Sequence, residues 1–572
     1  MLVHFITYII FCYFLLIGNK ANTEIHEISV DKSFFSSPVH HPIKLAGSFG
    51  ELRNSHYHTG IDIKTSEGVA GDPILAVADG IIHRMSIQSD GYGKSLFINH
   101  ANKISSVYGH LDRFHGKIED KSKQLQNHFK SYTYNYESQD STFSVKKGDT
   151  IGYMGNTGGS QAPHLHFELR ETANNTAINP LAWGFLVNDT VPPVIGGLTL
   201  FEAMDLSIDW KDTVYRCEYA DHKPVIRGDT ILVSGEKFYF GIRTIDYMTD
   251  NWNKPGIYGY RIFKDEKLIF SMKMDRIPMA FNRAIHYQCK YQPWMLYGDE
   301  WYLCRGLQAD PLKLNFDLSL SDGIFRFEKE DSTINFRIEV FDFGGNSTDL
   351  NFVAKKNKEP LNPFLMPWNA SIDLNRNYQF TENGHSFFIP KSTFLESKCI
   401  FISAGDTLPQ TFYFDIHGSN PQLFNPIYYV SPRLSNSDRT KMALALIKDG
   451  QAFKVPIDLN GNNITSQLIR KGLYRLTLDT VPPVLACWRV AKYNGDSFKF
   501  SIHDNFSYDP YFKDPMTFQA MIDGEWALVE YDKKFNLLTI KIESLNSGPH
   551  QLYLCAEDEH CNEVEYHTFF NI

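Results

Sequence analysis

The sequence has few cysteines, and none of them lies where a thiolate metal site would need it. Among 572 residues there are eight cysteines, no two in a C-x-x-C pair and none between Asn22 and Arg216. Any metal in that region must therefore use histidine and carboxylate ligands. Cys555 and Cys561 are the best candidates for a disulfide, with buried free thiols as the alternative. The cysteines beyond the apolar N-terminal run are Cys217, Cys289, Cys304, Cys399, Cys487, Cys555 and Cys561.

Long runs of charge of one sign are also absent. Lysine and arginine total 56 against 66 aspartates and glutamates, and the formal net charge of -10 is spread along the chain. This distribution argues against a dedicated nucleic-acid surface, so no nucleic-acid partner is expected. The hydrophobic share of 43% and the charged share of 21% are typical of folded globular proteins. At this length roughly three to five domains are expected.

One segment, at the N-terminus, is apolar enough to interact with a membrane. Residues Leu2 to Ile17 are rich in large apolar side chains, and polar residues follow from Gly18 to Thr23. We interpret residues 1–21 as a signal peptide, which predicts an exported protein that is periplasmic, associated with the cell envelope or secreted. The alternative is an uncleaved segment that attaches the chain to a membrane, although the run is shorter than a typical span of ~20 residues and no Lys or Arg precedes it.

Short apolar runs separated by glycine turns occupy residues 42–187. Residues 73–80 and 95–100 are predicted strands, and Gly91 to Gly93 form a tight turn, because glycine supplies the positive φ that a hairpin needs. A polar insertion from His115 to Ser144 interrupts the pattern. It either shapes a substrate groove or forms a solvated loop with a short helix. The region is predicted to be an all-β domain.

A repeated hexapeptide marks the entrances of two further regions. Asp-Thr-Val-Pro-Pro-Val occurs at residues 189–194 and again at 479–484, where the two prolines favour an extended connector. Residues 338–346 and 554–562, near the ends of the two regions, are also alike: each has a strand, an acidic turn and an asparagine. Two related β-sandwiches are therefore predicted. Their cores, rather than a glycan-binding platform, explain the aromatic content of 14%.

Two short patterns supply side chains that can bind a metal. His58 and Asp62 are separated as H-x-x-x-D, and Gly60 indicates a turn into a strand rather than a helix. On its own this pattern is also that of a solvated histidine and a turn aspartate. His164 and His166 alternate with apolar residues in a predicted strand, so both imidazoles point to one face. One of them can bind a metal while the other lies beside the water that the metal activates.

A third pattern, G-H-L at residues 109–111, places another histidine beyond the end of an apolar strand. In the order H-x-x-x-D, G-H-L and H-x-H, the three patterns resemble those of the lysostaphin/LytM-like zinc endopeptidases. The resemblance extends from about Ser48 to Pro180. It implies one zinc ion per chain, bound by three ligands, with two unliganded catalytic imidazoles beside it. The implied ligands are His58, Asp62 and His166, and the implied catalytic residues are His110 and His164.

The same resemblance, combined with the repeat, implies an all-β chain of several domains. A LytM-type peptidase domain of β-barrel or β-sandwich form is expected at residues 42–187. An immunoglobulin-like β-sandwich is expected at 191–356, a third accessory β domain at 357–478 and a second immunoglobulin-like β-sandwich at 479–572.

The implied activity is zinc-dependent hydrolysis of peptide cross-links in bacterial peptidoglycan. Three protein ligands leave a fourth position for water, whose pKa zinc lowers towards about 7, and the two histidines would orient or deprotonate that water and stabilise the oxyanion. Glu168, on the same strand face, is either a partner for an imidazole N–H or part of a structural salt bridge. The alternative function is a non-catalytic cell-wall-binding or amidase-activating protein, but all five expected positions are occupied here.

Overall fold

The computed structural model describes residues 31–572 except for short gaps. The predicted signal peptide at residues 1–21 lies outside the described residues. In the described part of the chain, no helix is both long enough and apolar enough to cross a membrane. The gaps are residues 54–55, 139, 205–210, 250–252, 283–287, 290–299, 307–311, 318, 329–331, 360, 362–369, 374, 392, 394–397, 405–409, 417–426, 431–438, 461–462, 469–471, 488–496, 509–515 and 543–544.

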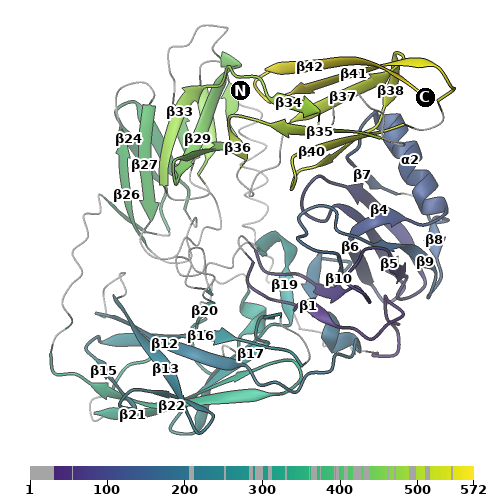
Figure 1. Ribbon diagram of the computed structural model, residues 1–572. Helices are drawn as coiled ribbons and strands as arrows, with labels where there is room; N and C mark the ends of the chain where they lie inside the picture. The colour runs from purple at the N-terminus through teal and green to yellow at the C-terminus, as the bar shows by residue number, and fades with distance from the viewer. Residues whose placement is uncertain are drawn as a thin grey trace.

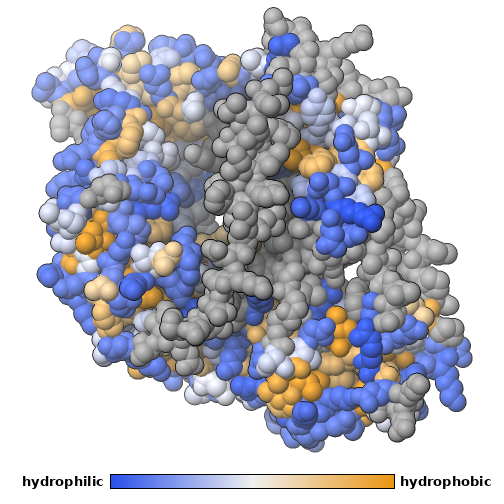
Figure 2. All heavy atoms as spheres, turned by 180° about the vertical axis from the view of Figure 1, so that it is seen from behind, coloured by the Kyte–Doolittle hydropathy of each residue, from blue (hydrophilic) through white to orange (hydrophobic). Residues whose placement is uncertain are grey.

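The described residues form mostly β-strands, which gather into several packed groups of sheets (Figure 1). Hydrophilic residues cover most of the described surface that is visible in Figure 2, with apolar residues in small groups between them. The apolar faces of the strands are therefore largely turned inwards. The helical elements are α2 (Lys117–Phe129) and the 3-10 helices η1 (Pro180–Trp183), η2 (Met279–Phe281) and η4 (Lys313–Asn315).

The N-terminal region is built on a twelve-stranded sheet whose main path is β1-β2-β10-β6-β5-β4-β7. Strand β10 contains the H-x-H pattern and lies between β2 and β6. Leu165, Phe167 and Leu169 on β10 are fully buried, which confirms the predicted strand. The strands are β1 (Leu45–Gly47), β2 (Ile61–Lys64), β3 (Pro73–Leu75), β4 (Gly80–Ile87), β5 (Lys94–His100), β6 (Ile104–Phe114), β7 (Tyr134–Glu137), β8 (Ser144–Val145), β9 (Thr150–Met154), β10 (His164–Glu171) and β11 (Thr176–Ile178).

The polar insertion contains a helix and an additional strand. Helix α2 begins after Gly116, which has a φ of 51°, and it buries Ile118 and Leu125. Strand β7 pairs with β4 and so extends the main sheet at its edge. The expected short helix is confirmed, but the insertion is more than a solvated loop because it adds a strand to the sheet.

The next region packs two five-stranded sheets, β14-β13-β12-β16-β20 and β15-β22-β21-β17-β18, against each other. Its core is continuous with that of the N-terminal region, since one cluster of buried side chains runs from Phe35 to Ala354. Strand β19 leaves this region and pairs with β11 as the twelfth strand of the N-terminal sheet. The strands are β12 (Val194–Ala203), β13 (Lys211–Ala220), β14 (Lys223–Ile226), β15 (Thr230–Val233), β16 (Lys237–Ile245), β17 (Gly259–Lys264), β18 (Lys267–Lys273), β19 (Arg276–Pro278), β20 (Trp301–Leu303), β21 (Thr333–Phe341) and β22 (Ser347–Lys356).

The third region packs the sheets β23-β26-β27-β33-β29-β30-β36 and β24-β25-β28-β32-β31 around a core of its own. Strand β36 comes from the last region and pairs with β30. The strands are β23 (Ala370–Ile372), β24 (Tyr378–Glu382), β25 (His385–Ile389), β26 (Lys398–Ala404), β27 (Gln410–Ile416), β28 (Ile427–Val430), β29 (Met442–Lys448), β30 (Gln451–Val455), β31 (Asp458–Asn460), β32 (Asn463–Gln467), β33 (Gly472–Leu478) and β36 (Ser507–Tyr508).

The last region also packs two sheets, β34-β35-β40-β39 and β38-β37-β41-β42, around a separate core. In Figure 1 these sheets lie beside α2 of the N-terminal region, and residues of both regions line one cavity. The strands are β34 (Val484–Cys487), β35 (Ser497–His503), β37 (Thr517–Ile522), β38 (Glu525–Ala527), β39 (Val529–Asp532), β40 (Leu537–Lys541), β41 (Pro549–Glu557) and β42 (Glu563–Asn571).

The candidate disulfide between Cys555 and Cys561 is not formed, and both residues are free thiols. Cys555 lies within strand β41, whereas Cys561 lies in the turn after it with a φ of 57°. Ala556 and Glu557 extend the strand beyond Cys555 before the turn begins, and each strand residue carries the chain about 3.3 Å further from Cys555. The short spacing in the sequence therefore does not bring the two sulfurs together.

Candidate metal centre

Three neighbouring elements of the N-terminal sheet carry the predicted site residues. His58 comes just before β2 and Asp62 lies within it, while His164 and His166 lie on β10 and His110 on β6. Asp62 is directly opposite His166 in the β2–β10 pairing. On the other side, His166 is opposite the residue before His110 in the β10–β6 pairing. Antiparallel register thus gathers residues that are about a hundred positions apart in sequence.

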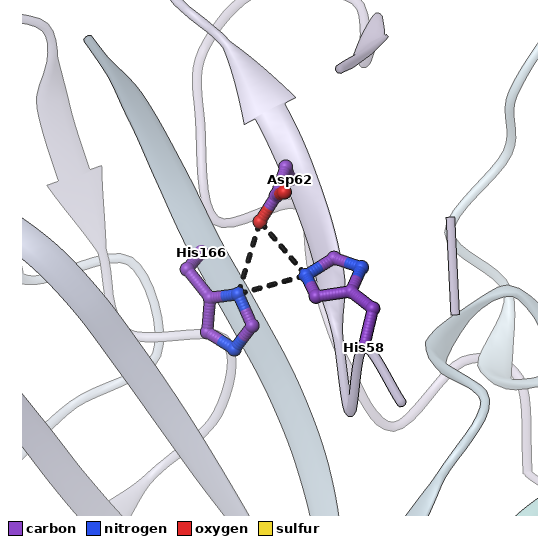
Figure 3. Close-up of side chains that lie close together, drawn as sticks. All are labelled: His58, Asp62 and His166. Carbon is purple, nitrogen blue, oxygen red and sulfur yellow. Dashed lines mark hydrogen bonds and ion pairs between the residues drawn. The ribbon is translucent and has the colours of Figure 1, made fainter. Parts of the chain in front are cut away.

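His58, Asp62 and His166 point towards one another (Figure 3). His58 Nε2 and His166 Nδ1 each lie 2.9 Å from Asp62 Oδ1, and the two ring nitrogens are 3.0 Å apart. All three residues are buried. Two imidazole nitrogens and one carboxylate oxygen thus converge on one point, which is the donor set of a zinc site with an open fourth position.

The hydrogen bond made by the other nitrogen of each ring decides whether a lone pair or an N–H is directed at this point. His58 Nδ1 lies 2.7 Å from the carbonyl oxygen of Ser48 and therefore donates its proton there. His166 Nε2 lies 2.7 Å from Glu168 Oε1 and donates to that carboxylate. Each ring is left with a lone pair directed at its neighbour, and two lone pairs at 3.0 Å repel each other unless a proton or a metal ion lies between them. These residues fit a metal ion.

Burial and neighbouring charges set the protonation of the group in the absence of metal. Burial lowers the pKa of His58 to about 4, so this ring is neutral at neutral pH. Burial acts in the same direction on His166, but hydrogen bonds to Asp62 and Glu168 outweigh it and raise the pKa of His166 to about 9. Burial acts to raise the pKa of Asp62, yet His58 and the hydrogen bonds from His164 and His166 hold that pKa well below its usual range. A metal must therefore displace one proton.

Glu168 combines the two roles between which the sequence could not decide. It is fully buried, and its Oε1 accepts hydrogen bonds from His166, from Thr59 Oγ1 and from the Tyr92 hydroxyl, each over 2.7 Å. Its Oε2 accepts from Arg170 Nε in a buried salt bridge. This arrangement fixes the ring orientation of His166. Sequence reasoning missed Tyr92 and Arg170 as supporting residues, although the first lies in the predicted Gly91–Gly93 turn and the second on β10.

Arg53 holds the remaining oxygen of Asp62. Its Nη2 donates to Asp62 Oδ2 over 2.7 Å, and its Nε lies 3.4 Å from Glu51 Oε1. With Oδ2 engaged in this way, Oδ1 is the oxygen that faces the two imidazoles. Sequence reasoning did not single out Arg53, although it opens the segment that holds His58.

His110 and His164 lie next to the converging group and next to each other. Their ring centroids are 4.8 Å apart, and the ring of His110 is 5.8 Å from that of His166. His110 Nδ1 donates to the carbonyl oxygen of Thr157 over 2.8 Å, which leaves its Nε2 as an acceptor. Burial, together with His164 and His166, lowers the pKa of His110 to about 3. His164 Nε2 lies 3.3 Å from Asp62 Oδ1, so both rings border the candidate metal position.

The last region contacts the loops that border this centre. Lys533 Nζ lies 3.3 Å from Asp90 Oδ2, and Lys534 Nζ donates to the carbonyl oxygen of Asn156. Asn156 precedes Thr157, the residue that positions His110. A cavity of about 670 Å³ lies alongside, lined by residues of α2, by Thr157 and by residues of the last region that include Trp526.

Comparisons with known proteins agree with this geometry. The model of "Peptidase family M23" matches residues 56–127 and 124–180, which include all five predicted site residues. The DD-carboxypeptidase/endopeptidase Mpg of Neisseria meningitidis is 34% identical over 131 residues, 23% of this chain and 24% of the relative. The peptidoglycan DD-endopeptidase ShyC of Vibrio cholerae is 29% identical over 146 residues, 25% of this chain and 28% of the relative. The chain thus spans about a quarter of the length of these relatives.

A solved structure is also similar to part of the chain. It is the catalytic domain of lysostaphin from Staphylococcus simulans, at 22% identity and a TM-score of 0.19, covering 25% of this chain and 91% of that one. The sheet and its converging His-Asp-His group define a candidate metallopeptidase centre. The N-terminal region is a lysostaphin/LytM-like domain of peptidase family M23, a family of zinc peptidases, and further β sheets follow it.

Proposed function

We propose that this chain is a zinc-dependent endopeptidase that hydrolyses peptide cross-links of bacterial peptidoglycan. The observation that carries the proposal is the convergence of two imidazole lone pairs and one carboxylate oxygen, with two further imidazoles beside them. In the proposed site, His58, Asp62 and His166 bind one zinc ion per chain. The name of one relative, a peptidoglycan DD-endopeptidase, supports the choice of substrate.

Zinc, when bound there, supplies a Lewis acid for the scissile carbonyl and favours deprotonation of water. His110 stays neutral and presents Nε2, so it can accept a proton from the attacking water. His164 borders the same space, and its Nδ1 donates to the carbonyl oxygen of Ala162, so its Nε2 donates a hydrogen bond to the oxyanion only when the ring is protonated. The water oxygen bonds to the carbonyl carbon, the C–N bond then breaks, and the proton held by the imidazole passes to the leaving amine. Exchange of these two tasks between His110 and His164 is compatible with their placement.

The cavity between α2 and the last region supports a path for the polymeric substrate. It is lined by Thr157 and Gly158, and the carbonyl oxygen of Thr157 accepts the hydrogen bond that orients His110. We therefore propose that the insertion between His115 and Ser144 forms one wall of a substrate groove, and that Trp526 forms part of the other. A groove between domains is a common position for a ligand site.

We propose the domains at residues 42–187, 191–356, 357–478 and 479–572, with immunoglobulin-like sandwiches for the second and the fourth. The paired sheets and the repeated hexapeptide support this division. A substrate in the cell wall also supports export to the cell envelope, by a signal peptide at residues 1–21.

Digestion of purified peptidoglycan tests the function. The zinc-loaded full chain is compared with His166→Ala, and the released muropeptides are identified by mass spectrometry. His567→Ala is the matched control, because that exposed histidine lies on β42 of the last region and does not line the cavity. New peptide ends are expected from the wild type and the control, and none from His166→Ala. Intact cross-links with a full complement of zinc would instead favour the non-catalytic, wall-binding or amidase-activating alternative.

A further inference from the structure

The hexapeptide repeat contributes to a second kind of side-chain cluster. This kind consists of aspartates only, whereas the candidate zinc centre has two histidines and one aspartate. Each copy of the repeat begins with an aspartate, and in the fold this aspartate meets two others from the same region. Within each cluster, one carboxylate oxygen from every aspartate lies within 4.8 Å of the others. The first cluster is Asp189, Asp246 and Asp342, and the second cluster is Asp479, Asp504 and Asp558.

The two clusters are constructed in the same way. In each region, the middle aspartate directly follows the strand that pairs with the strand after the hexapeptide. The register is also the same, since Val194 pairs with Ile245 in one region and Val484 with His503 in the other. The chain thus repeats a three-dimensional arrangement as well as a sequence.

An asparagine closes both clusters. Asn346 Nδ2 donates to Asp342 Oδ2 over 2.7 Å and to the carbonyl oxygen of Asp189 over 3.2 Å. Asn562 makes the equivalent two hydrogen bonds in the second cluster, over 2.8 and 3.3 Å. These bonds tie the last aspartate of each cluster to the backbone of the first, although like charges at this distance repel each other.

The second cluster already holds a cation that the protein supplies. Lys454 lies on β30 of the preceding region, and its side chain is 1% exposed. Its Nζ lies 3.3 Å from Asp479 Oδ2 and 3.3 Å from Glu559 Oε1. A buried ammonium group is tolerated only beside opposite charge. A cluster of this construction therefore takes up a positive charge at the junction of two domains.

The first cluster has the same carboxylates without a lysine. Asp246 is 3% exposed, and its carboxylate accepts a hydrogen bond from the backbone N–H of the adjacent Tyr247 over 3.0 Å. Within the described ranges, Asp189, Asp246 and Asp342 make no ion pair with any basic side chain. Buried carboxylates without a counter-charge are strongly unfavourable. Burial and the neighbouring Asp342 and Asp189 raise the pKa of Asp246 to about 8, so either a proton or a cation from solution can take the place that Lys454 has in the second cluster.

A cavity gives such a cation access. Its volume is about 260 Å³, and it lies at the junction of the M23 domain and the first accessory region. Ser48 and Phe49 of the M23 domain line it together with Asp189, Asp246 and Asp342. The cavity is large enough for an ion with several waters, each of which needs about 30 Å³.

We propose that Asp189, Asp246 and Asp342 bind one divalent cation of the calcium class. The side-chain ligands are all oxygens, which suits Ca²⁺ and not zinc. Ca–O distances of about 2.3–2.6 Å place opposite ligands roughly 5 Å apart, so oxygens within 4.8 Å of one another can share one ion. The ion braces the junction behind the zinc centre, because Ser48, whose carbonyl oxygen holds His58, lines the same cavity. The proposal does not depend on peptidase activity.

The test is a titration of calcium chloride into the zinc-loaded full chain. Isothermal calorimetry measures the heat of binding, and thermal denaturation measures the midpoint of unfolding. One calcium per chain and a midpoint that rises with calcium concentration are expected for the wild type. Asp246→Asn should weaken calcium binding by about tenfold or more, because ligand charge sets the affinity of such sites. Asp504→Asn is the matched control: it makes the same change in the second cluster and should leave calcium binding unaltered. Zinc content, measured in parallel, should equal one per chain throughout.

Three results would overturn the proposal. The first is the absence of both heat and a midpoint shift in the wild type at millimolar calcium. The second is calcium binding that persists in Asp246→Asn and in Asp342→Asn. The third is a loss of binding in Asp504→Asn alone. If Asp246→Asn does not fold, Asp342→Asn takes its place, and the wild-type titration still decides whether a calcium ion is bound.

Discussion

His166 donates a hydrogen bond from Nε2 to Oε1 of Glu168 over 2.7 Å, and this contact turns the other ring nitrogen of His166 towards Asp62. Glu168→Gln keeps the shape but removes the charge that makes the ring a strong ligand. We expect zinc affinity to fall by about 10–100-fold. Competition with a chromogenic chelator measures the affinity, and Glu67→Gln, at an exposed position, is the control. An unchanged affinity would show that Glu168 serves only the salt bridge with Arg170.

Zinc binding should release a proton. In the absence of metal the pKa of His166 is raised to about 9, above the ordinary value of 6.5, so the ring is charged at neutral pH. Apparent zinc affinity should therefore rise by about tenfold per pH unit between pH 6 and 8 and level off above pH 9. Calorimetry in buffers of different ionisation enthalpy counts the released proton.

The same raised pKa makes the metal-free chain sensitive to high pH. The stabilisation from His166 is complete below its unfolded pKa of about 6.5 and is lost as the pH rises through 9. Loss of the proton of His166 should thus lower the unfolding temperature of the metal-free chain at pH 9.5 relative to pH 6.5. Zinc-saturated chain and metal-free His166→Ala, which lack the titrating proton, should show a smaller change between the two values. A change of equal size in all three samples would contradict the assignment.

Lys454→Met should destabilise the last two regions. The change leaves the buried second cluster without its ammonium group, and removal of one partner from a buried ion pair costs about 3–5 kcal/mol. Urea denaturation measures the loss, and Lys448→Met, at an exposed position before the next strand, is the control. Added calcium should restore part of the stability, since the vacated cluster then resembles the first one.

Ile277→Ala should destabilise the M23 domain, although it lies about a hundred residues beyond that domain in the sequence. Ile277 is fully buried on β19, where it pairs with Ala177 of β11. The cavity should cost about 2–5 kcal/mol. Ile81→Ala, at a position that is 38% exposed, should change stability by no more than about 0.5 kcal/mol. Thermal unfolding of both variants is monitored through the release of zinc. Only Ile277→Ala should release zinc at a clearly lower temperature than the wild type.

Trp526→Ala tests the proposed groove. Trp526 lines the cavity beside Thr157, and Lys130 Nζ lies 5.0 Å from its ring centroid. Loss of an aromatic contact should raise KM for peptidoglycan by about fivefold or more and leave kcat unchanged. Phe535→Ala, at a side chain that is 69% exposed and does not line the cavity, should leave both constants unchanged. Equal effects of the two changes would place the substrate elsewhere.

Local patterns sufficed to predict much of the M23 domain. His164, His166 and Glu168 alternate with apolar residues, which predicts strand β10 and places the three polar side chains on one of its faces. The prediction holds because successive side chains on a strand point to opposite faces regardless of context. The three histidine patterns, in order, predicted which side chains would meet. The same local reasoning made Cys555 and Cys561 the best candidates for a disulfide, with free thiols as the alternative, and in the structure both are free thiols.

The sequence by itself therefore determined the β architecture, the repeat and the residue types of the candidate zinc centre. Tertiary structure alone decided which distant groups support them. Ser48 and Glu168 orient the imidazoles, β19 completes a sheet that begins more than two hundred residues earlier, and Lys454 enters a cluster of another domain. Such contacts join residues with no fixed spacing, so no periodicity records them, and they depend on packing and register that exist only once the chain has folded.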